Sequence, residues 1–305
     1  MLTTRRRLIA ISAAFAALPA IARADGGTAR LWTGQALGAR ASIRLDHPDG
    51  EAVAARVMAE IGRLEDILSL YRPESALSRL NREGRLAAPP FELLECLSLA
   101  GAVHHASGGR FDPTVQPLWA LWAEAAAKGA RPDAKSLEGV LRKTGWGRVE
   151  LDAAAITLRP GTALTLNGIG QGYVADRVAA LLETEGLTDI LIDTGEFRAL
   201  GGQPQGGEWP LRLETGERVA LRQRALATSA PLGTTFDQGG RDGHILDPET
   251  GMPAPAQWRS VSISAPSAAI ADALATAACL MPDREAVLAM ISRFDGARLE
   301  AGAMV

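Results

Sequence analysis

One carboxylate stands in an almost wholly apolar segment near the end of the chain. Residues 266–282, PSAAIADALATAACLMP, contain Asp272 and, four residues later, Thr276. On a helix this spacing places both side-chain oxygens on one face, and a buried carboxylate needs a partner. Oxygen ligands of this kind suit a hard cation such as Mg²⁺, which keeps waters or substrate phosphates in its other positions. Alternatively, Asp272 bonds a neighbouring loop and Thr276 bonds back to its own helix.

Three glycines alternate in the middle of the chain, at Gly168, Gly170 and Gly172. They follow an alternating segment, residues 155–166, and precede apolar residues at helical spacing, so the pattern predicts a strand, a glycine turn and a helix. Backbone groups at such a turn come close to a ligand, and a helix N-terminus favours an anion such as a phosphate. The spacing fits neither the dinucleotide fingerprint nor a Walker loop. A tight structural connection is therefore the alternative.

His244 is the histidine in a polar, glycine-flanked stretch, after a hairpin turn that we predict at residues 239–243. Its near-neutral pKa lets a histidine take a proton from an attacking hydroxyl, although it could instead stabilise the turn. His104 and His105 are adjacent and point to different faces of a helix, so we interpret them as structural or surface groups. No serine lies in a nucleophile-elbow pattern, which leaves a hydrolase triad unsupported.

The elements that must position these residues mix helices with short strands. Apolar periodicity predicts helices over residues 51–70, 91–106 and 267–281, and strands near residues 29–45, 155–166, 189–194 and 259–265. Two prolines predict irregular structure at the start of residues 108–122, and a variable helical excursion follows over residues 123–147. This mixture predicts an α+β fold with mixed and antiparallel sheets and peripheral helices.

Residues 1–24 have the pattern of an export signal. Three arginines precede an apolar run without acids, and a small-residue cleavage pattern follows at residues 22–24. The arrangement resembles a twin-arginine signal, which predicts a periplasmic protein; an ordinary secretory signal is the alternative. We expect residues 25–305 to form a single domain.

Composition narrows the class of partner. The formal charge is −3, and removal of the four arginines in residues 1–24 changes it to −7, so the sequence predicts no nucleic-acid partner. No later segment is long and apolar enough for a transmembrane helix. Cys96 and Cys279 lie in apolar helical stretches, which favours buried thiols over a disulfide between them.

Six motifs in this order resemble the ApbE family, the FAD:protein FMN transferases. The resemblance runs from about residue 31 to the C-terminus and is carried by LSLYRPESALSRLN, GGRFDPTVQPLWALW, LNGIGQGYVADRVAALL, ATS, GHILDPETGMP and ISAPSAAIADALATA. It implies a Mg²⁺-dependent enzyme that splits FAD, attaches FMN through a phosphoester to a threonine of an acceptor flavoprotein, and releases AMP.

The resemblance also implies roles for single residues. The metal ligands fall on the backbone carbonyl of Gly168 and on the side chains of Asp272 and Thr276, and His244 takes the place of a histidine that assists deprotonation of the acceptor hydroxyl. The positions that contact the flavin nucleotide are Leu37, Tyr71, Arg110, Phe111, Asp112, Thr165, Gln171 and Ile245.

Some positions depart from the family pattern. The family commonly has an acid at Thr165 and a Lys or Glu at Gln171, so two polar contacts to the nucleotide are altered, and residues 231–235 replace the usual aromatic-rich strand. The signal resembles that of the branch linked to nitrous oxide respiration, in which the acceptor would be a membrane respiratory component. Two other functions stay open: an FAD pyrophosphatase, in which water replaces the acceptor hydroxyl, and a non-catalytic periplasmic FAD-binding or donor protein. Asp272, Thr276 and His244 together favour catalysis, because a storage protein has no need of a base.

Overall fold

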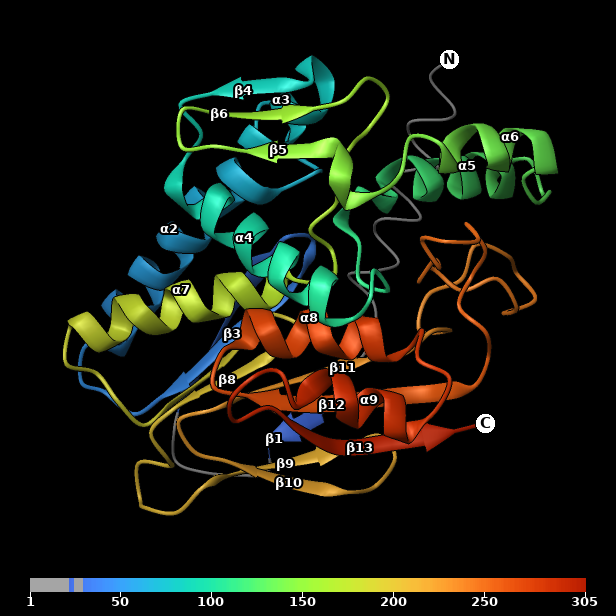
Figure 1. Cartoon of the computed structure of the whole chain (residues 1–305). Coiled ribbons are helices and arrows are strands. Elements are labelled where there is room, and N and C mark those ends of the chain that lie inside the picture. Colours follow the sequence, from blue (N-terminus) through green and yellow to red (C-terminus); the bar gives the residue numbers. More distant parts are fainter. Residues whose placement is uncertain (1–21, 25–29) are drawn as a thin grey trace.

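A seven-stranded antiparallel sheet forms the centre of the molecule (Figure 1). The structure is a computed structural model, and it describes residues 22–24 and 30–305. Neighbouring strands of this sheet are antiparallel throughout. From edge to edge they are β13 (Arg298–Met304), β12 (Trp258–Ala265), β11 (Ala225–Ser229), β8 (Phe197–Leu200), β7 (Ile190–Asp193), β3 (Ala39–Leu45) and β2 (Arg30–Ala36).

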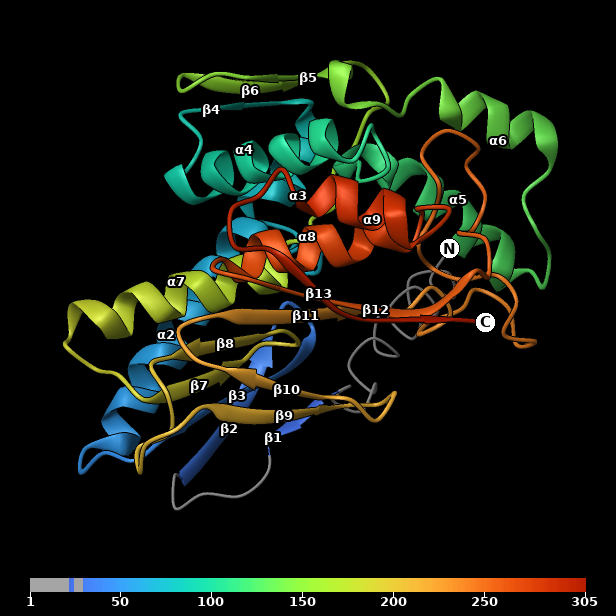
Figure 2. The ribbon, with the colours of Figure 1, turned by 60° about the horizontal axis from the view of Figure 1, so that its bottom comes forward.

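Helices cover one face of this sheet (Figures 1 and 2). The main core lies between them and the strands, and it is filled largely by leucine, isoleucine, valine and alanine. In the longest helix the apolar residues recur every three or four positions, so one face is buried along its whole length. The helices of this layer are α2 (Gly50–Leu68), α4 (Phe91–Ala106), α7 (Gly170–Thr184), α8 (Ala268–Ala278) and α9 (Arg284–Ile291).

A smaller sheet lies against the opposite face of the large one. It consists of β1 (Ala22–Ala24), β9 (Trp209–Leu213) and β10 (Arg218–Leu221). Strand β7 shows how one element serves both layers: Leu191 packs toward the small sheet, whereas Ile190 and Ile192 pack toward the helices. This follows from the alternation of side chains along a strand.

A third sheet and a pair of helices extend from the helical layer. The sheet has the order β4 (Arg85–Ala87), β6 (Ala155–Leu158) and β5 (Val149–Leu151), and α3 (Ala76–Glu83) lies beside it. The helices α5 (Gln116–Ala127) and α6 (Ala134–Leu141) stand to one side of the molecule (Figure 1). Short 3-10 turns, η1 (Pro113–Val115) and η2 (Trp146–Arg148), flank them.

The predicted α+β class is confirmed, and α4 spans the predicted residues 91–106. Two predicted boundaries are wrong. The strand predicted over residues 155–166 ends at Leu158, because Pro160 lies two residues further on and no partner strand continues beyond it. Helix α5 begins at Gln116 within the segment predicted to be irregular, since Pro117 lies in its first turn, where a missing N–H costs nothing.

Residues 1–21 of the predicted export signal lie outside the described residues, and Ala22–Ala24 form β1. Within residues 22–24 and 30–305, no helix combines the length and hydrophobicity needed to cross a bilayer. Cys96 and Cys279 are both buried free thiols, as expected, and burial raises the pKa of each.

Candidate active site

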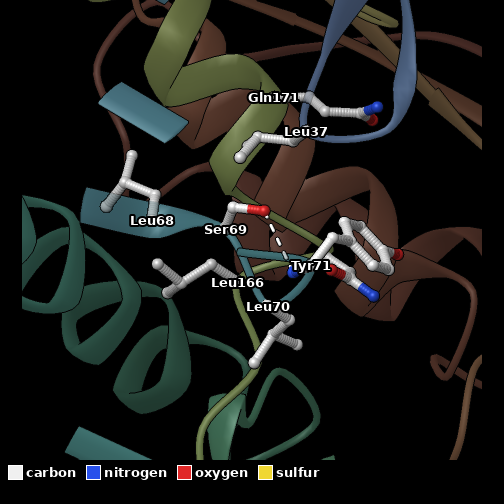
Figure 3. A pocket seen from close by; sticks show the side chains of 8 residues that line it. Leu37, Leu68, Ser69, Leu70, Tyr71, Leu166 and Gln171 are labelled. Atoms are coloured by element: carbon white, nitrogen blue, oxygen red, sulfur yellow. Dashed lines mark hydrogen bonds between the residues drawn. The ribbon is translucent and has the colours of Figure 1, made fainter. Parts of the chain in front are cut away.

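A hollow of about 420 Å³, including the open solvent at its mouth, lies at the start of α7 (Figure 3). Three of the predicted nucleotide contacts, Leu37, Tyr71 and Gln171, line it together. They come from the β2–β3 turn, the segment after α2 and the first turn of α7, so the fold brings together residues that are far apart in the sequence. The other lining residues are Leu68, Ser69, Leu70, Leu166 and Asn167.

The β2–β3 turn reaches this hollow because two glycines allow a close approach. Leu37 has a φ of +50°, and its backbone N–H donates to Oε1 of Glu65 at 2.8 Å. A Cβ at Gly38 would lie 3.2 Å from the Tyr71 ring, and one at Gly170 would lie 2.9 Å from Cδ1 of Leu37. The turn, the aromatic ring and the start of α7 therefore pack directly on one another.

The glycines of the central motif belong partly to the helix rather than to a turn before it. Gly170 and Gly172 lie in the first turn of α7, and the chain from Arg159 to Ile169 that precedes it contains no strand. The prediction of a strand leading directly into a glycine turn is therefore wrong. Close packing against other segments, rather than a turn conformation, is the reason for glycine at these two positions.

The predicted metal ligands meet where α7 and α8 touch. A Cβ at Gly168 would lie 3.0 Å from Oγ1 of Thr276 and 3.2 Å from Cε2 of Phe111. Asp272, one turn earlier on α8, is 3% exposed and accepts a hydrogen bond from the backbone N–H of Gly172 at 3.2 Å. In the sequence, Gly168 lies between Asn167 and Gln171, which line the hollow. Helix α8, which contacts Gly168 through Thr276, is therefore adjacent to the hollow.

A carboxylate on α7 fixes the start of α8. Asp176 accepts hydrogen bonds from the backbone N–H groups of Ala268 and Ala269, at 2.9 and 3.0 Å, and from Oγ of Ser267 at 2.7 Å. These are N–H groups that the first turn of a helix leaves without partners inside the helix. Asp176 thereby holds α8, with Asp272 and Thr276, in register with α7.

Asp272 shares its buried environment with a second carboxylate, Glu196, which follows β7. Burial raises the pKa of Asp272 to about 7, against the opposing effect of the Gly172 N–H. Burial, and then the charge of Asp272, raise the pKa of Glu196 well above its ordinary value. Glu196 accepts from the backbone N–H of Thr228 at 3.1 Å. In the part of the chain that the structure describes, no Lys or Arg forms an ion pair with either carboxylate.

Two buried carboxylates without a cationic partner are an environment that a divalent cation would relieve. The described residues contain no group of three or more His, Cys, Asp or Glu side chains arranged as a metal site. A cation here would therefore use the carboxylate of Asp272, the hydroxyl of Thr276, a backbone carbonyl and oxygens of water or substrate. This all-oxygen set with few protein ligands suits Mg²⁺.

His244 lies on a hairpin that begins after β11. Its Nδ1 lies 3.0 Å from the carbonyl oxygen of Thr234, and its backbone N–H donates to the same oxygen at 3.0 Å. Because a carbonyl only accepts, Nδ1 donates a proton to this oxygen. Burial lowers the pKa of His244 to about 4, more than the backbone of Thr234 and of Pro231 raises it. The imidazole is therefore neutral at neutral pH, as a general base must be.

The end of β11 leads into this hairpin and also contacts α8. Oγ of Ser229 lies 3.3 Å from Oγ1 of Thr276. Two residues later, the carbonyl of Pro231 packs so closely on Gly243 that no Cβ would fit there. His244 is thus held at the same end of the large sheet as Thr276.

The remaining predicted residues lie outside the lining of the hollow. Arg110 forms an ion pair with Asp247 at 3.0 Å and so joins two of the motifs. Asp112 accepts from the backbone N–H groups of Thr114 and Trp146, at 2.8 and 3.1 Å, which holds the loop before α5. The backbone N–H of Thr165 donates to the carbonyl of Pro113, and Ile245 is buried beside His244. Their contacts with a nucleotide stay predictions.

The model of the ApbE family matches residues 37–299. The chain belongs to the ApbE family. Among curated ApbE relatives, an FAD:protein FMN transferase of Treponema pallidum (strain Nichols) is 31% identical, over 84% of this chain and 79% of its own length. One of Vibrio cholerae (strain O395) is 30% identical, over 82% and 80%.

Solved ApbE structures share the fold. The ApbE protein of Thermotoga maritima superposes with a TM-score of 0.80 at 27% identity, covering 91% of this chain and 96% of its own. The flavinyl transferase ApbE of Pseudomonas stutzeri, in its apo form, gives 0.76 at 27% identity, covering 91% and 94%.

Proposed function

We propose that this protein is a Mg²⁺-dependent FAD:protein FMN transferase. It transfers FMN from FAD to a threonine of an acceptor flavoprotein and releases AMP. The observation that carries the proposal is the junction of α7 and α8, where Thr276 lies against Gly168 and Asp272 accepts from Gly172, beside the hollow lined by Leu37 and Tyr71. The curated relatives, which are named FAD:protein FMN transferases and are matched over about four fifths of their length, support it.

In this proposal one group of residues binds the metal and the nucleotide, and His244 acts on the acceptor hydroxyl. Asp272, Thr276 and the carbonyl of Gly168 would hold Mg²⁺, which when bound neutralises charge on the pyrophosphate of FAD. The hollow would take part of the nucleotide, and the half-exposed Tyr71 can stack on a ring there.

The acceptor hydroxyl needs a base on the other side of the phosphorus. Nε2 of His244 takes the proton of the threonine hydroxyl as its oxygen bonds to the phosphorus of the FMN half. The bond from that phosphorus to the oxygen shared with the AMP half breaks, and AMP leaves with the electron pair. The lowered pKa keeps the imidazole neutral, and the Nδ1–H bond to the carbonyl of Thr234 orients the ring for this proposed step.

The predicted site of action is the periplasm. The arginines and the apolar run of residues 1–24 support export by a twin-arginine-like route, and the proposed acceptor is a membrane flavoprotein.

The proposal is tested by incubating the purified protein with FAD and Mg²⁺, with and without an acceptor domain. AMP release and in-gel flavin fluorescence of the acceptor are followed together. AMP with covalent fluorescence supports the transferase. AMP without it in every acceptor tested indicates the pyrophosphatase, and FAD binding without AMP indicates a donor protein.

Asp272→Asn provides the test of the metal site, because it preserves the shape of the side chain and removes its charge. We expect FMN transfer to fall by at least about 100-fold, a typical loss for removal of one electrostatic contact to the reacting group. Mn²⁺ binding, measured by electron paramagnetic resonance, should be lost as well. Glu138→Gln on the exposed surface of α6 is the control. Wild-type Mn²⁺ affinity in Asp272→Asn would remove Asp272 from the metal site.

A further inference from the structure

A bidentate ion pair joins the hairpin that carries His244 to the connection between α5 and α6. Arg131 donates from Nε to Oδ2 of Asp242 at 2.7 Å and from Nη2 to Oδ1 at 2.6 Å. Two parallel hydrogen bonds of this kind fix the orientation of a carboxylate as well as its distance. Asp242 lies two residues before His244, so this ion pair holds the backbone next to the histidine.

The exposures of the two partners differ greatly. The side chain of Asp242 is 7% exposed and that of Arg131 is 57% exposed. A buried carboxylate that loses its partner is strongly destabilised, because its charge is left without compensation. Among the described residues, Arg131 is the ion-pair partner of Asp242. This pair therefore differs from an ordinary surface salt bridge, which contributes little.

The turn itself is closed by other groups. Oδ1 of Asp237 accepts from the backbone N–H groups of Arg241 and Asp242, both at 2.8 Å, and the N–H of Phe236 donates to the carbonyl of Asp242 at 2.7 Å. These contacts fix the internal shape of residues 236–242. The two hydrogen bonds from Arg131 add a directional contact between this closed turn and the α5–α6 connection.

Helix α5 supports the same hairpin through aromatic contacts. The rings of Trp119 and Trp122 pack on Phe236, with centroids 5.5 and 5.7 Å apart from it. Nε1 of Trp122 also donates to the carbonyl of Gly251 at 2.8 Å, beyond His244 in the sequence. The hairpin and the α5–α6 unit therefore form one packed body, in which the Arg131 fork is the most directional contact.

We propose that Arg131 is a positioning residue for the transfer reaction, acting through Asp242 to direct Nε2 of His244 at the acceptor hydroxyl. The inference rests on the proposed role of His244 as the base. Arg131 itself does not line the hollow, and its printed side-chain bonds go to Asp242, so we expect it to act on the base rather than on the nucleotide.

The first test compares Arg131→Ala with Arg142→Ala. Arg142 forms an exposed i,i+4 pair with Glu138 at 2.7 Å in the same α5–α6 unit and serves as the matched control. We expect Arg131→Ala to lower kcat for FMN transfer about 10- to 100-fold, the scale of a misplacement of about 1 Å. The dissociation constant for FAD should stay within about twofold, and Arg142→Ala should match the wild type. Arg131→Lys, which keeps the charge without the fork, should restore only part of kcat.

The second test repeats Arg131→Ala in a His244→Ala background, with residual transfer measured over hours by mass spectrometry of the acceptor. Because Arg131 acts through His244, no further loss of kcat is expected there. A further loss as large as in the wild-type background would overturn the proposal. So would an unchanged kcat in Arg131→Ala, or an equal weakening of FAD binding.

A measurement without turnover separates this proposal from the proposed function. Arg131→Ala should shift the NMR resonances of the His244 ring, assigned by their absence in His244→Ala, whereas Arg142→Ala should not. If the wild type transfers no FMN and the ring still shifts, the proposed function fails and the placement of His244 by Arg131 stands. Unmoved ring resonances in Arg131→Ala overturn the placement.

Discussion

Burial lowers the pKa of His244 below that of an exposed histidine. Its pKa in the folded protein is about 4, against an ordinary value of 6.5. As pH falls from 6.5 to 4, the unfolded chain binds a proton here and the folded chain does not. His244 therefore contributes stability that is present above pH 6.5 and is lost as pH falls toward 4, by at most about 3 kcal/mol.

This residue-scale prediction is checked by urea unfolding at pH 7.5 and pH 4.5. His244→Ala should lose less stability over this interval than the wild type, whereas His47→Ala, in the loop before α2, should follow the wild type. The same loss in His244→Ala as in the wild type would contradict the lowered pKa. Transfer activity, for the same reason, should show no loss near pH 6.5 that depends on His244.

The residues of the site could be predicted to different degrees. Asp272 and Thr276 were predictable because a carboxylate in an apolar helix requires a partner, whatever the rest of the fold. The position of Glu196 beside Asp272 could not be predicted, since an acid after a buried strand has the same sequence pattern whether it faces solvent or a second carboxylate. The signal that could have indicated it is its position directly after Gly195 at the end of β7.

At the scale of elements, the site depends on how closely α7 and α8 approach each other. A Cβ at Gly172 would overlap with the carbonyl of Ala268 and lie 2.8 Å from the nitrogen of Ala269, and both groups are backbone that cannot turn aside. We expect Gly172→Ala to separate the helices and lower the free energy of unfolding by about 1–3 kcal/mol. It should also weaken Mn²⁺ binding, since Gly168 and Asp272 would move apart.

Gly62→Ala is the matched control for this prediction. Gly62 lies within α2, and a Cβ there would meet no atom within 4 Å. The same chemical change should raise stability by about 0.4–1 kcal/mol, because alanine has less freedom to lose from the unfolded chain. Urea unfolding of both variants measures the contrast. If Gly172→Ala also proved stabilising, the close approach of the two helices would be refuted.

Elements were predictable from sequence where one local pattern determines them. Helix α4 begins after Pro90 and ends before Ser107 and two glycines, so both of its ends could be located. The segment before α7 alternates like a strand as far as Leu166, but a strand also needs a partner. The third sheet ends with the pairing of Leu158, and that pairing is a tertiary fact that no local pattern contains.

At the scale of the whole molecule, the large sheet brings the site together from distant parts of the chain. The hollow is lined by residue 37, residues 68–71 and residues between 166 and 171, helix α8 supplies residues 272–276, and the proposed base is residue 244. All of these depend on the strand order of the seven-stranded sheet, in which β11 lies between β12 and β8. Strand order arises from pairing between distant segments of the chain. The sequence motifs therefore indicated the candidate residues, whereas the sheet determines which of them lie close together.

The last prediction concerns how much of the N-terminus the fold needs. Strand β1 pairs with β9 over three residues, Ala22–Ala24, and β9 keeps β10 on its other side. Among the described contacts, cleavage after Ala24 would remove the pairing of β1 with β9, and each of its few hydrogen bonds has a net contribution of about 1 kcal/mol. We therefore expect a chain that starts at Asp25 to keep FMN transfer at the full-length rate, with only a small loss of stability.

A chain that starts at Leu37 gives the contrast, because it lacks β2 as well. Strand β2 pairs with β3 along seven residues, Trp32 packs on Gly50 of α2, and Ala36 is fully buried. Its removal exposes the edge of the large sheet next to the turn that carries Leu37, so both stability and FAD binding should fall sharply. Urea unfolding and FAD titration of the two chains decide the matter. If the chain from Asp25 were as unstable as the chain from Leu37, β1 would be an essential part of the fold, and residues 22–24 could not belong to a removable signal.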